Sequence, residues 1–141
     1  MKYNETYRLV KSEDLNHHGT LFAGRMTEWF VENCFITVAN EYKHPENLVC
    51  LKVHDLGFTR PIKKGDIINI KSKIIYAGNT SLTVYGKVNR NNTEDVVVDG
   101  FITFVCVDEN GQKMNHNIIV DEKNDSEDLE ILNRLNNIRK Y

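Results

Sequence analysis

Residues 24–42, GRMTEWFVENCFITVANEY, are rich in apolar side chains, show no strict alternation and contain no proline. This pattern predicts a helix of about five turns that ends before Pro45, because a residue that precedes proline disfavours the helical region. Its apolar positions cover nearly the whole circumference of a helical wheel, which is typical of a helix buried on every side. They are Met26, Trp29, Phe30, Cys34, Phe35, Ile36, Val38 and Ala39.

After the helix the sequence changes to β-rich runs, at residues 48–58, 66–77, 81–88 and 95–108, and the connections between them have hairpin length. Residues 3–10 alternate loosely and predict a further strand before the helix. We therefore expect an α+β fold in which a curved antiparallel meander wraps the helix. One sheet covers only one face of such a helix, so the remaining apolar surface predicts a dimer or a larger oligomer.

Composition limits the classes of partner and the cell compartment. The 141 residues suit one domain, and 18 basic against 20 acidic residues give a net charge of −2, with the basic residues scattered. Nucleic acid and membrane are therefore not expected partners. No segment approaches the roughly 20 apolar residues of a membrane span, and the first residues lack the apolar core of a signal peptide. We therefore expect a cytoplasmic protein. The three cysteines are widely spaced and no two histidines have the i, i+4 spacing of a helical metal site, so we expect no bound metal.

The C-terminal part differs in composition from the rest. Residues 1–120 form the expected domain, and residues 121–141 form an acidic tail. Apolar residues recur in the tail at helical spacing, at Leu129, Ile131, Leu132, Leu135 and Ile138. This spacing predicts a short amphipathic helix that docks on the domain or on a neighbouring molecule.

The residues that lead into the long helix carry a motif. NHHGTLFAGRMTEWFVE (16–32) resembles the N-H-x-G-T-L-F-G-G-x-x-x-x-W signature of hotdog-fold acyl-CoA thioesterases, the group that includes the cytosolic acyl-CoA hydrolases. FTRPIKKGDIINIKSKIIYAGNTSLTVYGKV (58–88) and GFITFVCVDENGQ (100–112) resemble later strands of the same family. The resemblance covers residues 5–115.

The resemblance implies a hotdog fold, in which an antiparallel sheet encloses one long helix and two protomers join their sheets. It implies acyl-CoA as the substrate, with no metal and no organic cofactor. It also implies active sites at the interface of a homodimer, which in such proteins assembles further into tetramers or hexamers.

Thioester hydrolysis needs a water molecule or a carboxylate aimed at the carbonyl carbon, and hydrogen-bond donors where the oxyanion forms. Gly19 and Gly24 allow close approach of the backbone to a ligand, and N–H groups of the first helical turn can polarise the thioester oxygen. The resemblance implies that Asn16 orients the attacking water. His17 is a further candidate for a hydrogen bond near the thioester.

The identity of the catalytic acid departs from the family pattern. The family's aspartate falls at Val31 in this chain, and Glu32 matches a second acidic position of many relatives. Glu28 lies one turn nearer the N-terminus of the helix, at a small rotation around the helix axis from Val31. This geometry favours Glu28 as the catalytic base, whereas the position in the motif favours Glu32. Alternatively, both glutamates form an acidic edge of the helix that Arg25 balances.

Two loops provide the candidate substrate-binding residues. The resemblance implies that they meet the pantetheine and the phosphates of coenzyme A, and Arg and Lys suit phosphates chemically. These residues are Arg60, Lys63 and Lys64 in the first loop, and Gly78, Asn79, Thr80 and Ser81 in the second.

The expected activity is hydrolysis of acyl-CoA to coenzyme A and a carboxylic acid. Two alternatives remain open. Val31 at the acid position also fits a protein that binds acyl thioesters without hydrolysing them, as a sensor or carrier. A dehydratase of hydroxyacyl thioesters is the third hypothesis, although the NHHGTLF motif is not typical of those enzymes.

Overall fold

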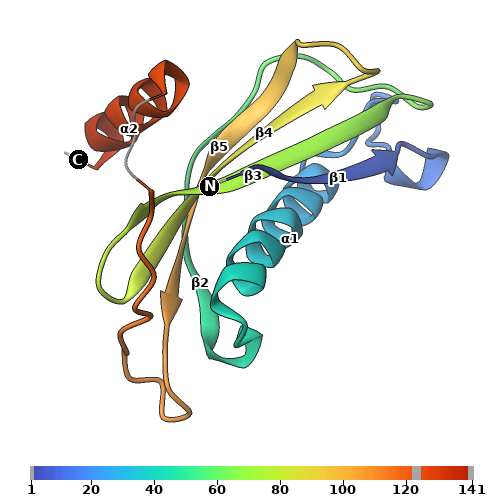
Figure 1. The fold of residues 1–141 in the computed structure, drawn as a ribbon. Coiled ribbons are helices and arrows are strands. Elements are labelled where there is room, and N and C mark those ends of the chain that lie inside the picture. The colour runs from blue at the N-terminus through green and yellow to red at the C-terminus, as the bar shows by residue number, and fades with distance from the viewer. Residues whose placement is uncertain (1, 122–124, 140–141) are drawn as a thin grey trace.

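The structure is a computed structural model, and it describes residues 2–121 and 125–139. Within these residues, five strands, two α-helices and two short 3-10 turns follow one another (Figure 1). The elements are β1 (Asn4–Leu9), a 3-10 turn (Ser12–Asp14), α1 (Ala23–Tyr42), a second 3-10 turn (Pro45–Asn47), β2 (Leu48–Phe58), β3 (Ile67–Ala77), β4 (Ser81–Arg90), β5 (Val96–Cys106) and α2 (Ser126–Ile138). The predicted helix and the predicted strands are confirmed to within a few residues.

The strands form one antiparallel sheet in the order β1-β3-β4-β5-β2. Strands β3, β4 and β5 form the expected meander, but the prediction that β2 continues it is wrong. β2 lies at the far edge and pairs with β5, from Leu48 opposite Cys106 to Phe58 opposite Val98. The reason lies in the connection between β2 and β3, which crosses the end of the sheet instead of making a tight turn (Figure 1).

Helix α1 packs in the concave face of the curved sheet, as expected for a hotdog fold (Figure 1). Phe30 and Cys34 are fully buried against the sheet. A methyl group on Gly86 of β4 would come within 2.6 Å of the Phe30 ring, so the glycine permits the close contact of helix and strand. Glu28 and Glu32 are exposed. The helix is therefore buried on one face within a single chain, and not on every side as its composition predicts.

Polar residues form a buried network beneath α1. Asn33 donates to the Thr6 hydroxyl at 2.9 Å and to the Ile70 carbonyl at 3.2 Å. Its side-chain oxygen accepts from the Ser72 hydroxyl at 2.5 Å, and Ser72 also contacts the Thr37 hydroxyl at 2.7 Å. Because buried polar groups are costly when unpaired, this network fixes the register of α1 on β1 and β3.

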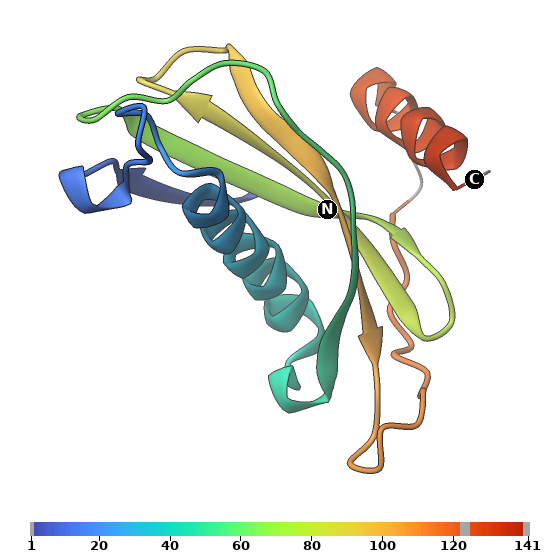
Figure 2. The same ribbon diagram turned by 180° about the vertical axis from the view of Figure 1, so that it is seen from behind.

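Helix α2 covers the opposite face of the sheet, so that the two helices lie on either side of it (Figure 2). Ile131 and Leu135 pack against Tyr85 and Phe101 in a second hydrophobic cluster. The helical tail is confirmed, and it docks on the domain of its own chain. The boundary at residue 120 stays a prediction, and residues 122–124 and 140–141 of the predicted tail lie outside the described residues.

Charged pairs attach α2 to the outer face. Lys73 of β3 is buried and forms an ion pair with Asp128, and Arg134 bonds to Asp99 of β5 at 2.7 Å. The Asp125 side chain caps the helix by accepting from the Glu127 amide at 2.7 Å. Both apolar contact and ion pairing therefore hold the tail in place.

Candidate active site

A tight turn before α1 is built around Asn16. Its side-chain oxygen accepts from the backbone amides of His18 at 2.8 Å and Thr20 at 3.1 Å, and its side-chain nitrogen donates to the Thr20 hydroxyl at 3.0 Å. Gly19 has a φ of 81°, a conformation that side chains rarely adopt. The motif thus encodes a rigid turn, with Asn16 at its centre and one amide hydrogen of Asn16 left for a further partner.

The turn is fastened to its surroundings by backbone hydrogen bonds. Leu21 donates to the Ile62 carbonyl at 2.7 Å, which joins it to the connection between β2 and β3. Phe22 donates to the Asp14 carbonyl at 2.9 Å. Asp14 itself is only 2% exposed, and its carboxylate lies 3.6 Å from the Arg25 guanidinium. Sequence reasoning missed Asp14, because an acidic residue in a polar loop gives no local sign of burial.

The first backbone amides of α1 have no partner within the helix, and the Phe22 ring lies beside them, where a methyl group on Gly24 would come within 2.6 Å of the ring. Phe22 is the N-cap residue, and it provides no side-chain hydrogen bond to the helix. The first turn carries no acidic residue, so the partial positive charge of the helix end is not neutralised there. Because α1 begins at Ala23, the backbone amides of Ala23, Gly24 and Arg25 have no carbonyl acceptor one turn earlier within the helix. This end of α1 can therefore stabilise a developing negative charge.

A pocket of about 240 Å³ joins these parts. Asn16 and Leu21 line it from the turn, and Ala23 and Met26 line it from α1. The connection after β2 supplies the remaining lining, from Phe58 through Thr59, Arg60 and Pro61 to Ile62. Its lining is mainly apolar, with Asn16, Thr59 and Arg60 as the polar residues, and no carboxylate of the described residues lines it.

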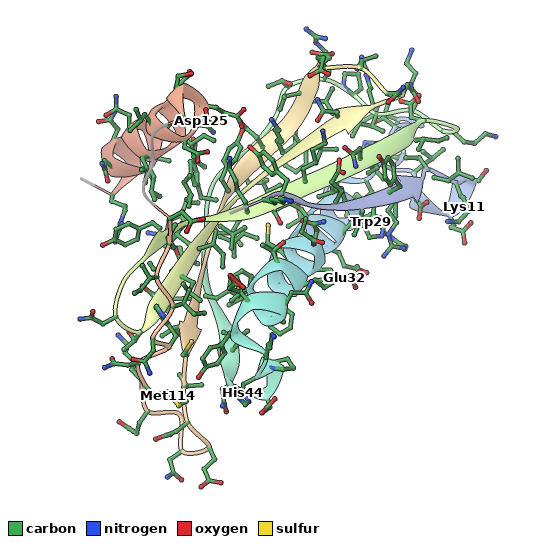
Figure 3. All side chains as sticks on the ribbon, viewed as in Figure 1. Lys11, Trp29, Glu32, His44, Met114 and Asp125 are labelled. Carbon is green, nitrogen blue, oxygen red and sulfur yellow. The ribbon has the colours of Figure 1, made fainter. Side chains whose placement is uncertain are left out.

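The two candidate catalytic glutamates lie away from this pocket. Trp29 and Glu32 project from the same side of α1 (Figure 3). Arg8 of β1 forms an ion pair with Glu32 at 3.1 Å and stacks over the Trp29 ring. Glu28 is exposed one turn earlier, and no side chain among the described residues pairs with it. The alternative in which Arg25 balances both glutamates is wrong, because Arg25 pairs with Asp14.

The first substrate-binding loop lies beside the pocket. Arg60 lines the pocket and forms an ion pair with Asp95. Lys63 forms a backbone bridge with Thr20, which places this lysine next to the Asn16 turn. The side chain of Lys64 is exposed. His17 is also exposed and lies against the ring of His18, outside the pocket lining.

The second substrate-binding loop lies elsewhere. Gly78, Asn79 and Thr80 form the turn between β3 and β4, and Ser81 begins β4, at the opposite end of β3 from the first loop. The 11 residues of β3 separate the two loops by roughly 35 Å. One chain therefore does not bring both loops to one site, contrary to the expected common neighbourhood.

The described residues show neither a metal centre nor a membrane helix. No group of three or more His, Cys, Asp or Glu side chains in ranges 2–121 and 125–139 is placed to hold a metal ion. No helix within those ranges is long and apolar enough to cross a membrane.

The chain is similar to known proteins in sequence and in structure. An uncharacterized acyl-CoA thioester hydrolase of Bacillus subtilis (strain 168), YkhA, is 26% identical over 103 residues, which are 70% of this chain and 59% of that protein. The chain thus matches little more than half the length of this relative.

Solved structures share the fold over nearly the whole chain. An acyl-CoA hydrolase from Staphylococcus aureus, solved with butyryl coenzyme A, coenzyme A and coenzyme A disulfide, has a TM-score of 0.79 at 25% identity, with 98% of this chain and 84% of that chain covered. An acyl-CoA hydrolase from Bacillus cereus has a TM-score of 0.83 at 21% identity, with the same coverage of each chain. The fold is therefore the hotdog fold.

The model of the Thioesterase superfamily matches residues 18–97, more than half of the chain. The matched segment contains α1, β2, β3 and β4, and it begins within the turn that Asn16 organises. The chain belongs to the thioesterase superfamily.

Proposed function

We propose that this protein hydrolyses acyl-CoA thioesters to coenzyme A and a carboxylic acid. The main support is the pocket in which the Asn16 turn meets the uncapped N-terminus of α1. Membership of the thioesterase superfamily adds to it. Relatives from three bacteria that are named acyl-CoA hydrolases support the substrate class. The reaction needs no metal and no organic cofactor, and we place it in the cytoplasm.

The backbone of α1 supplies the oxyanion donors in this proposal. A thioester oxygen placed at the amides of Ala23 and Gly24 gains hydrogen bonds that strengthen as negative charge develops on it. The free amide hydrogen of Asn16 holds the attacking water at the same end of the pocket. Arg60, Lys63 and Lys64 bind the phosphates of coenzyme A at the pocket rim.

Glu28 is the proposed general base. Glu32 is held by Arg8, whereas Glu28 lies nearer the N-terminus of α1 and has no side-chain partner among the described residues. The Staphylococcus aureus enzyme has been solved with alanine in place of an asparagine and of an aspartate. Those two residues are as far apart in their sequence as Asn16 and Val31 are in this one, which supports Val31 as the position of the family's acid.

A second copy of the chain completes the site, because Glu28 does not line the pocket of its own chain. The β2 edge offers the interface: Val49, Leu51 and Val53 are 48%, 59% and 41% exposed, and no strand of the described residues pairs with β2 on that side. Pairing of two β2 edges would cover these residues and satisfy the free backbone groups. We propose a homodimer of this form, which can assemble further into a tetramer or hexamer.

A second candidate function has one observation in its favour. No carboxylate among the described residues lines the pocket, so a protein that binds acyl thioesters without hydrolysing them also fits this geometry. Such a protein would bind acyl-CoA saturably and release no thiol.

Thiol release from short, medium, long and aromatic acyl-CoAs, measured with a disulfide reagent, tests the proposal. Glu28→Gln is expected to lower kcat at least about 100-fold, the usual contribution of a general base. Glu32→Gln is the matched control, with the same chemical change one turn away, and should stay within about threefold of wild type. Absence of turnover in the wild type, with saturable binding, would establish the second function. Equal losses in both variants would refute the assignment of Glu28.

A further inference from the structure

A polar pocket of about 470 Å³ lies on the face of the sheet opposite α1, at the start of β3 and the end of β4, away from α2 (Figure 1). Its lining comes from β1, β3, β4 and the connection between β4 and β5. Ile70 and Val88 belong to the core beneath α1, so the alternation of strand side chains directs their neighbours Asn69 and Asn89 to the opposite face. Both asparagines line the pocket.

The two strand asparagines lie opposite each other in the register of β3 and β4. Asparagine is uncommon within strands, and these positions need an explanation. Asn69 donates to the Thr6 carbonyl at 3.3 Å. Asn89 is only 7% exposed, and within ranges 2–121 and 125–139 its side chain has no hydrogen-bond partner. Because a buried amide without a partner is costly, Asn89 indicates a ligand that completes its hydrogen bonds.

The connection between β4 and β5 contains two more asparagines, which the fold itself explains. Asn91 and Asn92 have φ values of 52° and 60°. The Thr93 amide donates to the Arg90 carbonyl at 3.1 Å, so the two residues form the centre of a tight turn, where asparagine is favoured. No turn accounts for the two strand asparagines.

The other side chains of the lining limit the charge of a ligand. Glu5 and Glu94 contribute carboxylates, and Lys71 is the cationic side chain among the described residues of the lining. Lys71 already pairs with Glu5 at 3.5 Å. An anionic ligand would therefore meet an excess of negative charge. Tyr7 also lines the pocket and is 66% exposed, so an aromatic ring is accessible there.

We propose that this pocket binds a neutral sugar, with hydroxyl groups of the sugar on Asn69 and Asn89 and the C–H face of its ring on Tyr7. A side-chain amide both donates and accepts, as a hydroxyl does, so two adjacent amides suit neighbouring hydroxyl groups. The volume lies within the range of roughly 300–1,000 Å³ that is usual for small-molecule sites. The pocket is separate from the proposed active site on the α1 face and from the proposed dimer interface, because β1 and β2 are opposite edges of the sheet.

NMR of the Asn89 side-chain amide in the intact protein tests the site directly. The probes are glucose, N-acetylglucosamine and maltose, at up to about 100 mM, because a few neutral hydrogen bonds support only millimolar affinity. At least one of these sugars should shift the Asn89 signals saturably. Sorbitol has similar hydroxyl groups but no ring face to stack on Tyr7, and it should bind at least about threefold more weakly. Coenzyme A should leave the signals unchanged, because its phosphates are repelled.

Variants are compared by saturation-transfer NMR of the sugar that binds. Tyr7→Ala and Asn89→Val are each expected to weaken binding about three- to tenfold, through loss of stacking and of hydrogen bonds. Asn40→Ala is the matched control: it truncates an exposed asparagine of α1 and should keep the affinity within about twofold. Asn89→Val should not lower the midpoint of urea unfolding, because the wild-type amide has no hydrogen bond within the described residues to lose.

The site is refuted if none of the three sugars shifts the Asn89 amide, or if sorbitol or coenzyme A shifts it with equal affinity. Unchanged sugar affinity in Tyr7→Ala and Asn89→Val would also overturn the proposal. A lower urea midpoint for Asn89→Val would assign this side chain to the stability of the fold instead of to a ligand. None of these measurements involves thiol release, so the proposed hydrolysis is tested separately.

Discussion

Gly86 sets the distance between α1 and the sheet, and Gly86→Ala is expected to destabilise the fold. The added methyl group would lie 2.6 Å from the Phe30 Cζ atom, 2.8 Å from Cε2 and 3.3 Å from the Cys34 sulfur. Normal contacts of this kind exceed 3.4 Å. Because Phe30 is fully buried, the ring or the helix must shift, and overpacking of this size costs about 1–3 kcal/mol of unfolding free energy.

The assay is urea unfolding followed by circular dichroism at a fixed protein concentration, since association contributes to the stability of oligomers. Gly57→Ala in β2 is the matched control, because a methyl group there meets no atom within 4 Å, and it should change the free energy by less than about 0.5 kcal/mol. Phe30→Leu removes the ring atoms that the methyl group meets. The cost of Gly86→Ala should therefore be smaller in the Phe30→Leu background. An unchanged stability of Gly86→Ala, or an equal cost in both backgrounds, would refute the reasoning.

Three further perturbations test other parts of the structure. Asn33→Ala leaves buried partners unsatisfied and should cost about 2–3 kcal/mol in urea unfolding, whereas Asn40→Ala at an exposed position of the same helix should cost less than about 0.5 kcal/mol. Asp128→Asn leaves the Lys73 ammonium buried without a counter-charge, so α2 should become sensitive to limited proteolysis while the domain stays intact. Equal resistance of α2 to the protease in the wild type and the variant would contradict this. The His54 imidazole should titrate below 6.5 in NMR, and a value at or above 6.5 would disprove the shift. The neutral ring stabilises the fold above pH 6.5. This contribution is lost as the pH falls toward the folded pKa, because the unfolded state then binds more protons than the folded state.

The sequence predicts the elements of this fold better than their arrangement. Helix α1 is recognisable because its apolar residues are continuous and lack proline, and the strands are recognisable because the pattern then alternates. The position of β2 is not encoded locally. The amide of Thr59 bonds to the Val97 carbonyl and Ile62 accepts from Leu21, so contacts distant in sequence carry the connection across the end of the sheet.

The candidate site shows the same division. The motif around Asn16 and Gly19 identifies the start of α1 as a candidate site, but the hydrogen bonds that make it a rigid turn are visible only in the structure. The buried carboxylate of Asp14 and the pairing of Glu32 with Arg8 depend on partners from other elements, so no local pattern reveals them. Ser72 completes the network of Asn33 from 39 residues away, and it reads in the sequence as an ordinary strand serine.

The edge position of β2 also orders events during synthesis. Leu48 pairs with Cys106 and Phe58 with Val98, so β2 leaves the ribosome well before the strand that it pairs with. Until β5 follows, an apolar strand with free backbone groups on both sides is exposed to other nascent chains. Helix α1 and the β3–β4 hairpin can form earlier, because their contacts are closer in sequence. In the proposed homodimer, the last step of folding and the first step of subunit association involve the same strand. Slow completion of β5 would then favour aggregation over assembly.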